Sequence, residues 1–440
     1  MDTPPRLAVD RLLDDRETRI IVCCGAGGVG KTTTAAALGV RAAGRGRKAV
    51  VLTIDPARRL AQSMGIDSLD NTPRKVETVG AGDGELHAMM LDMKRTFDEI
   101  VEAHADGERA KAILANPFYQ SLSAGFAGTQ EYMAMEKLGQ LRARDDWDLI
   151  IVDTPPSRSA LDFLDAPKRL GSFLDGKFIR VLMAPAKVGG RAGMKFLNVG
   201  MSMMTGTLSK LMGASLLKDV QTFVAAMDTM FGGFRTRADA TFRLLQAPGT
   251  AFLVVAAPEA DALREAAYFV ERLAAESMPL AGLVLNRVHG SGADQLSAER
   301  ALAAAENLEE GGIVDQESGK AGLRDPGAEP KGTAETAGSA ETAQTAHSTR
   351  TTPTAHPPET DSPGTEGDTA VVDRITAGLL RLHAERMQVI AREQRTRDRF
   401  TSLHPEVAVA EVAALPGDVH DLAGLRAIGE RLAAGVPAGA

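Results

Sequence analysis

A glycine-rich segment that ends in a lysine and a threonine could bind phosphate groups. Residues 25–32 read Gly-Ala-Gly-Gly-Val-Gly-Lys-Thr and fit the pattern G-x-x-x-x-G-K-[ST]. Glycines let successive backbone N–H groups turn toward phosphate oxygens, and the positive end of a following helix adds to the attraction. In such a loop the lysine, Lys31, reaches the β- and γ-phosphates, and the Thr32 hydroxyl binds Mg²⁺. We expect the following residues to contact a nucleoside triphosphate: Gly25, Ala26, Gly27, Gly28, Val29, Gly30, Lys31, Thr32 and Thr33.

Two aspartates follow apolar runs and could serve the same reaction. Asp153 closes the run 149–152, and in P-loop enzymes an aspartate in this position holds Mg²⁺. Asp55 closes the run 50–54 and could position the water that attacks the γ-phosphate. It could equally cap the helix that begins near Pro56, and spacing alone leaves both interpretations open.

An asparagine at the end of a third apolar run indicates which base is bound. Asn286 follows the run 283–285 and precedes Arg287, and we expect both to contact the nucleotide. An amide both donates and accepts, as the adenine edge requires. The alternative is a loop asparagine that bonds local backbone. The guanine-selecting pattern Asn-Lys-x-Asp is absent, which disfavours a GTPase. The Leu-Ser-Gly-Gly-Gln signature of ABC-type ATPases is absent as well.

The elements that must position these residues alternate in type along the chain. Short apolar runs alternate with helical stretches, a pattern that predicts an α/β fold with a doubly wound, mostly parallel sheet. Ligands of such sheets bind at the carboxyl ends of the strands, where the candidate residues lie. We expect strands at 20–24, 48–54, 85–91, 147–153, 250–257, 280–287 and 406–412.

Composition divides the chain further. One P-loop domain is expected over 18–435, with a helical subdomain at 168–235 that is rich in methionine. Residues 306–370 hold thirteen acidic and four basic residues and are predicted to form a disordered low-complexity insertion. The rest of the chain is nearly neutral although the net charge is −8, so no nucleic-acid partner is expected. No leader or membrane-spanning run is recognised, and a cytoplasmic protein is expected.

The only two cysteines, Cys23 and Cys24, are adjacent on an expected strand and are predicted to be core thiols on opposite faces. The methionines of 168–235 allow two interpretations. They could form ordinary core, or they could line a flexible groove for apolar segments.

The loop, Asp55-Pro56-Ala57, Asp153-Thr154-Pro155-Pro156 and Asn286-Arg287 together resemble the arsenical-pump and tail-anchored-protein-targeting ATPase family. The resemblance covers 18–290 and 371–435 and is strongest to actinobacterial anion-transporting ATPases, through 55–62 and 128–137. It implies that ATP and Mg²⁺ are the cofactors and that Asp55 orients the hydrolytic water in the first switch. It also implies that Asp153 begins the second switch, that Asn286 contacts adenine and that the loop near Pro416 packs beside the base. The methionine-rich helices would correspond to the region that binds hydrophobic segments in targeting members.

The sequence also departs from this family. Members usually carry a second lysine after the first loop glycine, which reaches the partner's phosphates across a dimer interface, but here that residue is Ala26. The zinc-binding cysteine pair of targeting members and the arsenite-binding thiols are missing too. With a single loop, a paired site needs a second chain, either another copy or a lysine-bearing paralogue.

Together these features predict a Mg²⁺-dependent, ATP-hydrolysing dimeric switch. It would couple hydrolysis to a membrane transporter or to a hydrophobic membrane-protein client, and could thereby associate peripherally with a membrane. The alternative is a nucleotide-binding, poorly hydrolysing regulatory subunit that needs a lysine-bearing paralogue.

Overall fold

Runs of Ile, Val and Leu form an eight-stranded sheet because extended, apolar segments can be buried on both faces. The computed structural model describes residues 5–54, 59–77, 84–123, 129–155, 236–311 and 365–434. The strands are β1 (Ile20–Cys24), β2 (Lys48–Thr53), β3 (Arg74–Lys75), β4 (Glu85–Met90), β5 (Leu149–Asp153), β6 (Thr250–Ala256), β7 (Leu280–Val288) and β8 (Val409–Ala413).

Helices connect these strands. They are α1 (Val9–Asp14), α2 (Lys31–Gly44), α3 (Arg59–Ser63), α4 (Met93–His104), α5 (Gly107–Leu114), α6 (Pro117–Ser123), α7 (Thr129–Arg144), α12 (Ala260–Ala275), α13 (Ala298–Gly311), α14 (Thr365–Leu403) and α15 (Leu422–Ala434). Residues 236–246 are also helical.

The sheet order is β3-β4-β2-β5-β1-β6-β7-β8, with every pair parallel except β3–β4. The central strand β1 therefore lies between β5 and β6. Strands are added on both sides of β1, so the loop from β1 to α2 lies at the switch point of the sheet. In register, Asp153 of β5 lies beside Cys23 of β1 and Thr53 of β2. This arrangement confirms the predicted doubly wound, mostly parallel α/β fold.

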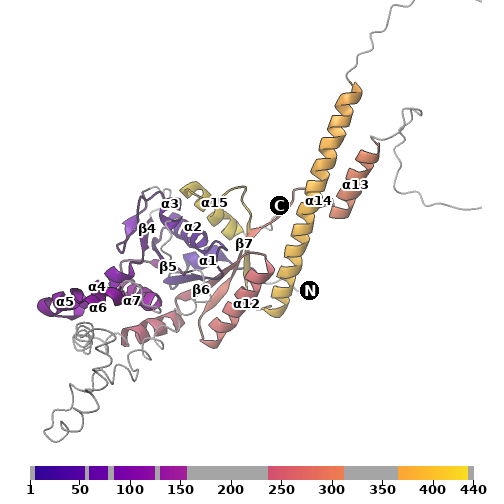
Figure 1. Cartoon of the computed structure of the whole chain (residues 1–440). Helices are drawn as coiled ribbons and strands as arrows, with labels where there is room; N and C mark the ends of the chain where they lie inside the picture. The colour runs from indigo at the N-terminus through magenta and orange to yellow at the C-terminus, as the bar shows by residue number, and fades with distance from the viewer. Residues whose placement is uncertain are drawn as a thin grey trace, which may run out of the picture. The chain divides into compact units, whose positions relative to one another are not determined.

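Helices cover both faces of the sheet. Side chains of α4, α7 and α12 pack on one face, whereas those of α1, α2 and α15 pack on the other (Figure 1). The two cysteines lie on opposite faces, as predicted, and both are fully buried. Burial raises the pKa of the Cys24 thiol to about 12 and the pKa of Cys23 well above its usual value. Both are therefore neutral core groups.

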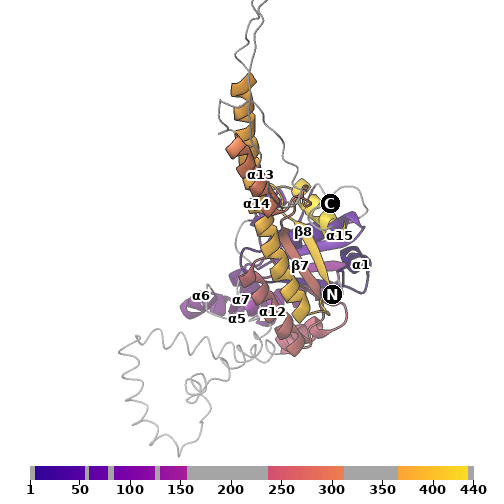
Figure 2. The same cartoon turned by 90° about the vertical axis from the view of Figure 1, so that its right-hand side faces the viewer.

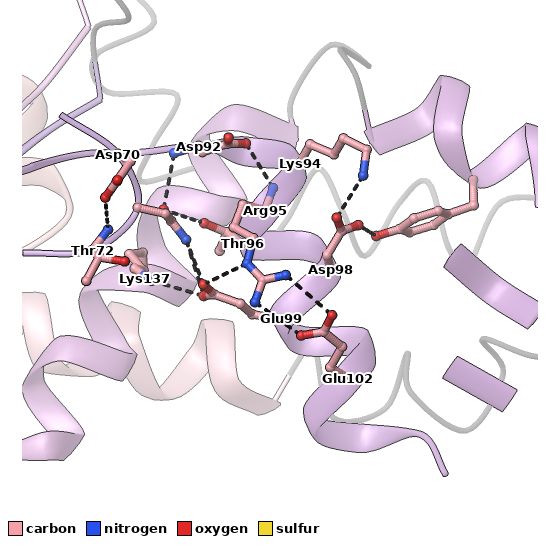
Figure 3. A network of polar contacts seen from close by, with 12 residues as sticks. Asp70, Thr72, Asp92, Lys94, Arg95, Thr96, Asp98, Glu99, Glu102 and Lys137 are labelled. Atoms are coloured by element: carbon pink, nitrogen blue, oxygen red, sulfur yellow. Dashed lines mark hydrogen bonds and ion pairs between the residues drawn. The ribbon is translucent and has the colours of Figure 1, made fainter. Parts of the chain in front are cut away.

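A partly buried polar network connects α4 to its neighbours (Figure 3). Glu99 of α4 accepts hydrogen bonds from Asn71 Nδ2 at 3.2 Å and forms an ion pair with Lys137 of α7 at 3.0 Å. Asn71 Oδ1 accepts from Thr96 Oγ1 at 3.1 Å and from the backbone N–H of Asp92 at 3.2 Å. The contacts join α4, α7 and the end of β4 through groups that water reaches poorly.

Two compact units divide the chain. The first comprises Met1–Gly292 and Ile390–Ala440, and the second is Ala293–Val389. The single domain over 18–435 stays a prediction. Helix α14 contributes to both units because it runs through residue 390.

The acidic insertion predicted at 306–370 lies mostly outside the described residues. Its central part, 312–364, and the helical subdomain at 168–235 lie outside the described residues. At its ends, α13 continues to Gly311 and α14 begins at Thr365. A scarcity of large aliphatic residues does not prevent a helix from continuing, because the helix forms its hydrogen bonds within its own backbone.

Candidate phosphate-binding cleft

The glycine-rich loop lies between β1 and α2, at the carboxyl end of the central strand. Gly30 is the N-cap of α2 and has φ of 93°, a left-handed conformation that favours glycine. A Cβ at Gly30 would lie 2.2 Å from Asn286 Nδ2, so only glycine fits against that side chain. The loop thus directs its backbone toward the N-terminus of α2, where N–H groups have no partner within the helix.

Lys31 is the first residue of α2 and is almost completely buried. Its Nζ donates a hydrogen bond to the Ala26 carbonyl at 2.7 Å, so the side chain folds back over the loop. A lysine held there places a positive charge inside the ring of backbone groups. An anion that enters the loop would meet this charge.

Asp153 joins the loop to two strands. Its Oδ2 accepts hydrogen bonds from Thr32 Oγ1 at 2.7 Å and from Thr53 Oγ1 at 2.9 Å, and the residue is fully buried. Thr32 and Asp153 were both predicted as Mg²⁺ ligands, and the structure brings them into direct contact. Hydroxyl and carboxylate oxygens are the ligands that Mg²⁺ prefers, so this donor set fits the ion.

The end of β7 holds the loop from the other side. Asn286 is buried, and its Nδ2 donates to the Val29 carbonyl at 2.9 Å. The exposed Arg287 has φ of 60° and donates to the Gly28 carbonyl. The pairing of β7 with β8 shifts between Asn286 and Val288, which leaves Arg287 out of the ladder. The irregular strand end therefore turns two neighbouring side chains onto the loop.

These parts open into one cleft of about 1300 Å³, which is larger than a typical small-molecule pocket and has room for a nucleotide. Predicted residues that line it are Gly28, Gly30, Lys31, Thr32, Thr33, Asn286, Arg287 and Pro416. The predicted residues Gly25, Ala26, Gly27, Val29 and Asp153 are described nearby but do not line the cleft. Asp55 lies outside the described residues, and so the alternatives for its role stay open.

Sequence reasoning missed several residues of the cleft. His289 and Glu393 lie on its wall, where Glu393 accepts from the His289 backbone N–H at 3.0 Å and from its Nδ1 at 2.6 Å. They are 104 residues apart in sequence, and no local pattern pairs them. Gln130 of α7, which lies in the segment 128–137 and does not line the cleft, donates to the Ile54 carbonyl at 3.0 Å, immediately before Asp55.

Asp92, a third aspartate at the end of a strand, has a different role. Its side chain accepts from the Arg95 backbone N–H at 2.9 Å and caps α4, away from the cleft. Both aspartates follow a strand, so this position alone does not indicate which of them lies at the loop. Asp153 lies there because its strand, β5, pairs with β1, which leads into the glycine-rich loop.

The sheet, the loop and the cleft define a P-loop nucleotide-binding protein of the α/β class. The family model described as anion-transporting ATPase matches residues 18–310. The chain therefore belongs to the anion-transporting ATPase family and is an ATPase.

Curated relatives agree with this membership. The chain is 26% identical to ATPase GET3 of Podospora anserina over 66% of its own length and 80% of that protein. It is 30% identical to ATPase GET3 of Malassezia globosa over 38% of its length and 47% of that protein. It is 28% identical to a putative arsenical pump-driving ATPase of Halobacterium salinarum over 41% of its length and 28% of that protein.

The part of the chain that the structure describes contains no helix long and apolar enough to cross a membrane.

Proposed function

We propose that this chain hydrolyses ATP in a Mg²⁺-dependent manner and acts as a dimeric switch. The observation that supports this most directly is the contact of Thr32 with the buried Asp153, at the base of a loop closed by Lys31. A threonine and an aspartate in contact beside a phosphate loop are the parts that P-loop enzymes use.

Each residue has a distinct role in this proposal. Lys31 and the backbone N–H groups of the loop would stabilise charge on the β- and γ-phosphates, since phosphoryl transfer depends mainly on positioning and electrostatics. Lys31 would exchange the Ala26 carbonyl for phosphate oxygens, which carry more charge. Asp55 would orient the attacking water in line with the γ-phosphate.

Thr32 and Asp153 would hold Mg²⁺. When bound, the ion neutralises charge on the β- and γ-phosphate oxygens. The chain supplies the oxygens: the Thr32 hydroxyl, and the Asp153 carboxylate either directly or through water.

Asn286 and Pro416 would bind the adenine ring. One N–H of the Asn286 amide bonds the Val29 carbonyl, which fixes the plane of the side chain. An amide has a second N–H and a carbonyl oxygen that can face the adenine edge. Pro416 lies in the connection between β8 and α15 on the same cleft wall and would pack beside the base.

Replacing Lys31 tests the proposal. We expect Lys31→Ala to lower the rate of ATP hydrolysis at least about 100-fold, because it removes the cation nearest the loop. Phosphate release under saturating ATP and Mg²⁺ measures the rate, with circular dichroism as a check on folding. Lys111→Ala is the matched control, since Lys111 is exposed and pairs only with Glu108 among the described contacts. Wild-type turnover in Lys31→Ala would overturn the assignment.

Ala26 supports a second candidate, a regulatory subunit that binds ATP but hydrolyses it poorly without a lysine-bearing paralogue. A single-turnover experiment with enzyme in excess separates the two. Fast cleavage of one ATP per chain identifies an enzyme, whereas stable bound ATP identifies the regulatory subunit.

The switch would couple ATP hydrolysis to a membrane transporter or to a hydrophobic membrane-protein client. Arsenical pumping in the name of one relative suggests the former. The methionine-rich segment, which includes Met201, Met204 and Met212, would contact either partner, and it lies outside the described residues. Photocrosslinking at these positions with and without ATP distinguishes a soluble complex with an apolar client from capture of an integral membrane protein.

A further inference from the structure

Helix α14 carries a row of exposed aliphatic side chains in the second unit. Eight large hydrophobic side chains are exposed among the described residues, and six of them lie on this helix between 371 and 389. They are Val371, Val372, Ile375, Leu379, Leu382 and Val389, and their exposed fractions range from 39% to 63%. Exposed apolar side chains that gather on one element mark an interaction surface.

The spacing of the row is that of a coiled coil. Positions 372, 375, 379, 382, 386 and 389 follow one another in steps of three and four residues, the a and d pattern of a heptad repeat. Only Arg386 departs from aliphatic character. We call these six positions the α14 seam. A seam with this period fits another helix better than a flat or irregular partner.

Helix α13 does not cover the α14 seam. It runs beside α14 in both views of the molecule (Figures 1 and 2). Ala377 and Ala384 are fully buried, and α14 also holds α13 through Arg381, which pairs with Glu309 at 2.5 Å. At 3.6 residues per turn, Ala377 and Ala384 project roughly opposite to the seam. Among the described residues, α13 therefore leaves the seam uncovered.

The chain between α13 and α14 is poorly suited to be that partner. Residues 315–364 contain one large aliphatic residue, Leu323, and consist mainly of small, polar and charged types. Such a segment cannot match a row of five aliphatic side chains. A second α14 supplies the same number of side chains at the same spacing.

We propose that two copies of this chain associate by packing their α14 seams together in antiparallel orientation. Arg386 decides the orientation. A parallel, in-register pair would set Arg386 against the partner's Arg386 inside the seam, where two like charges repel. An antiparallel pair centred between residues 380 and 381 sets Arg386 against the partner's Ile375 instead.

The antiparallel register matches the remaining positions as well. Leu379 faces the partner's Leu382, and Val372 faces the partner's Val389. All layers that do not contain Arg386 are therefore aliphatic on both sides. The seam spans about three heptads, near the lower limit for a coiled coil. We therefore expect a concentration-dependent association, and the inference does not rest on the proposed ATPase mechanism.

Sedimentation velocity of the full chain between about 1 and 100 µM, with and without ATP, tests the association. We expect wild type to dimerise within this range, and the double variant Leu379→Glu/Leu382→Glu to raise the dissociation constant at least tenfold. Leu403→Glu is the control: it makes one Leu→Glu change on the same helix at a similarly exposed position outside the seam. If the double variant retains the wild-type dissociation constant, or if wild type stays monomeric throughout, the proposal fails.

Disulfide formation tests the orientation. Both native cysteines are buried, so an introduced cysteine reports without background. We expect no dimeric product from Val372→Cys or Val389→Cys alone, because like positions lie about 25 Å apart along an antiparallel pair. A mixture of the two variants should form the intermolecular disulfide. Crosslinking in either single variant would instead indicate a parallel pair, and no crosslink in the mixture would refute the seam.

Discussion

Asp153 is a buried carboxylate at the end of an apolar strand, and its charge must be compensated. Two threonine hydroxyls, from Thr32 and Thr53, donate to the same oxygen. Hydrogen bonds from neutral donors reduce the cost of burying a charge, but a cation compensates for it more completely. A divalent ion bound with the nucleotide would therefore compensate the charge of Asp153.

Replacing the charge while keeping the shape of the side chain tests this role. Asp153→Asn should weaken Mg²⁺-dependent ATP binding about 10- to 100-fold and change metal-free nucleotide binding little. Calorimetric titration of ATP with Mg²⁺ or with EDTA measures both. Asp92→Asn, the same change after β4, which is separated from β5 by β2, should leave both affinities unchanged because Asp92 caps α4. An equal loss with and without Mg²⁺ would contradict a role in binding the ion.

Local sequence identified the residues of the loop but not the contacts that close it. A pattern over eight positions specifies Lys31 and Thr32, because their roles follow from their spacing. The bond of Asn286 to Val29 joins residues 257 positions apart, and only the order of β1, β6 and β7 brings them together. The His289–Glu393 pair was not predictable for the same reason.

At the scale of elements, Arg47 connects the segments that precede β1, β2 and β5. It precedes β2, is almost completely buried and donates to four backbone carbonyls: Leu13 at 2.9 Å, Asp15 at 2.8 Å, Thr18 at 2.7 Å and Asp148 at 2.5 Å. Burial lowers the pKa of the guanidinium, although a group with so high an ordinary pKa stays charged. The guanidinium donates the hydrogen bonds that water or the ladder of the sheet would otherwise provide to these carbonyls.

Arg47→Met should therefore lower the free energy of unfolding by about 2 to 4 kcal/mol, because several buried carbonyls lose their donor. Urea unfolding followed by circular dichroism measures the change. Arg45→Met, two residues earlier, removes a partly exposed pair with Asp14 and should cost less than about 1 kcal/mol. Similar losses in the two variants would mean that the carbonyl contacts contribute little.

Strand positions were predictable because a parallel strand is buried on both faces and its sequence is a continuous apolar run. The seven predicted strands are all present, with boundaries that differ by at most three residues. Strand β3 was missed because two residues give no periodicity, and it forms only where Arg74 and Lys75 meet the edge of β4. Strand β5 begins at Leu149, two residues later than predicted, and the ring of Trp147 before it packs against the His87 ring.

At the scale of the whole molecule, Ala26 raises the question of which chain completes the site. Ala26 is buried, and its carbonyl accepts a hydrogen bond from the ammonium group of Lys31 within the same loop. The resemblance to family members with a lysine here implies that their partner chain supplies a second cation to the phosphates. A dimer of this chain would lack that cation in both sites, so we expect slow hydrolysis when it acts alone.

Restoring the cation on a partner that is itself inactive tests this expectation. The double variant Ala26→Lys/Lys31→Ala should not hydrolyse ATP, because it lacks its own phosphate-binding lysine. Mixed with wild type, it should raise turnover at least tenfold, since a cation supplied in trans stabilises the transition-state charge. Ala26→Met/Lys31→Ala, of similar length but uncharged, is the control and should have no effect. A rise with both variants would indicate a change in loop packing, whereas no rise with either would show that the sites work independently.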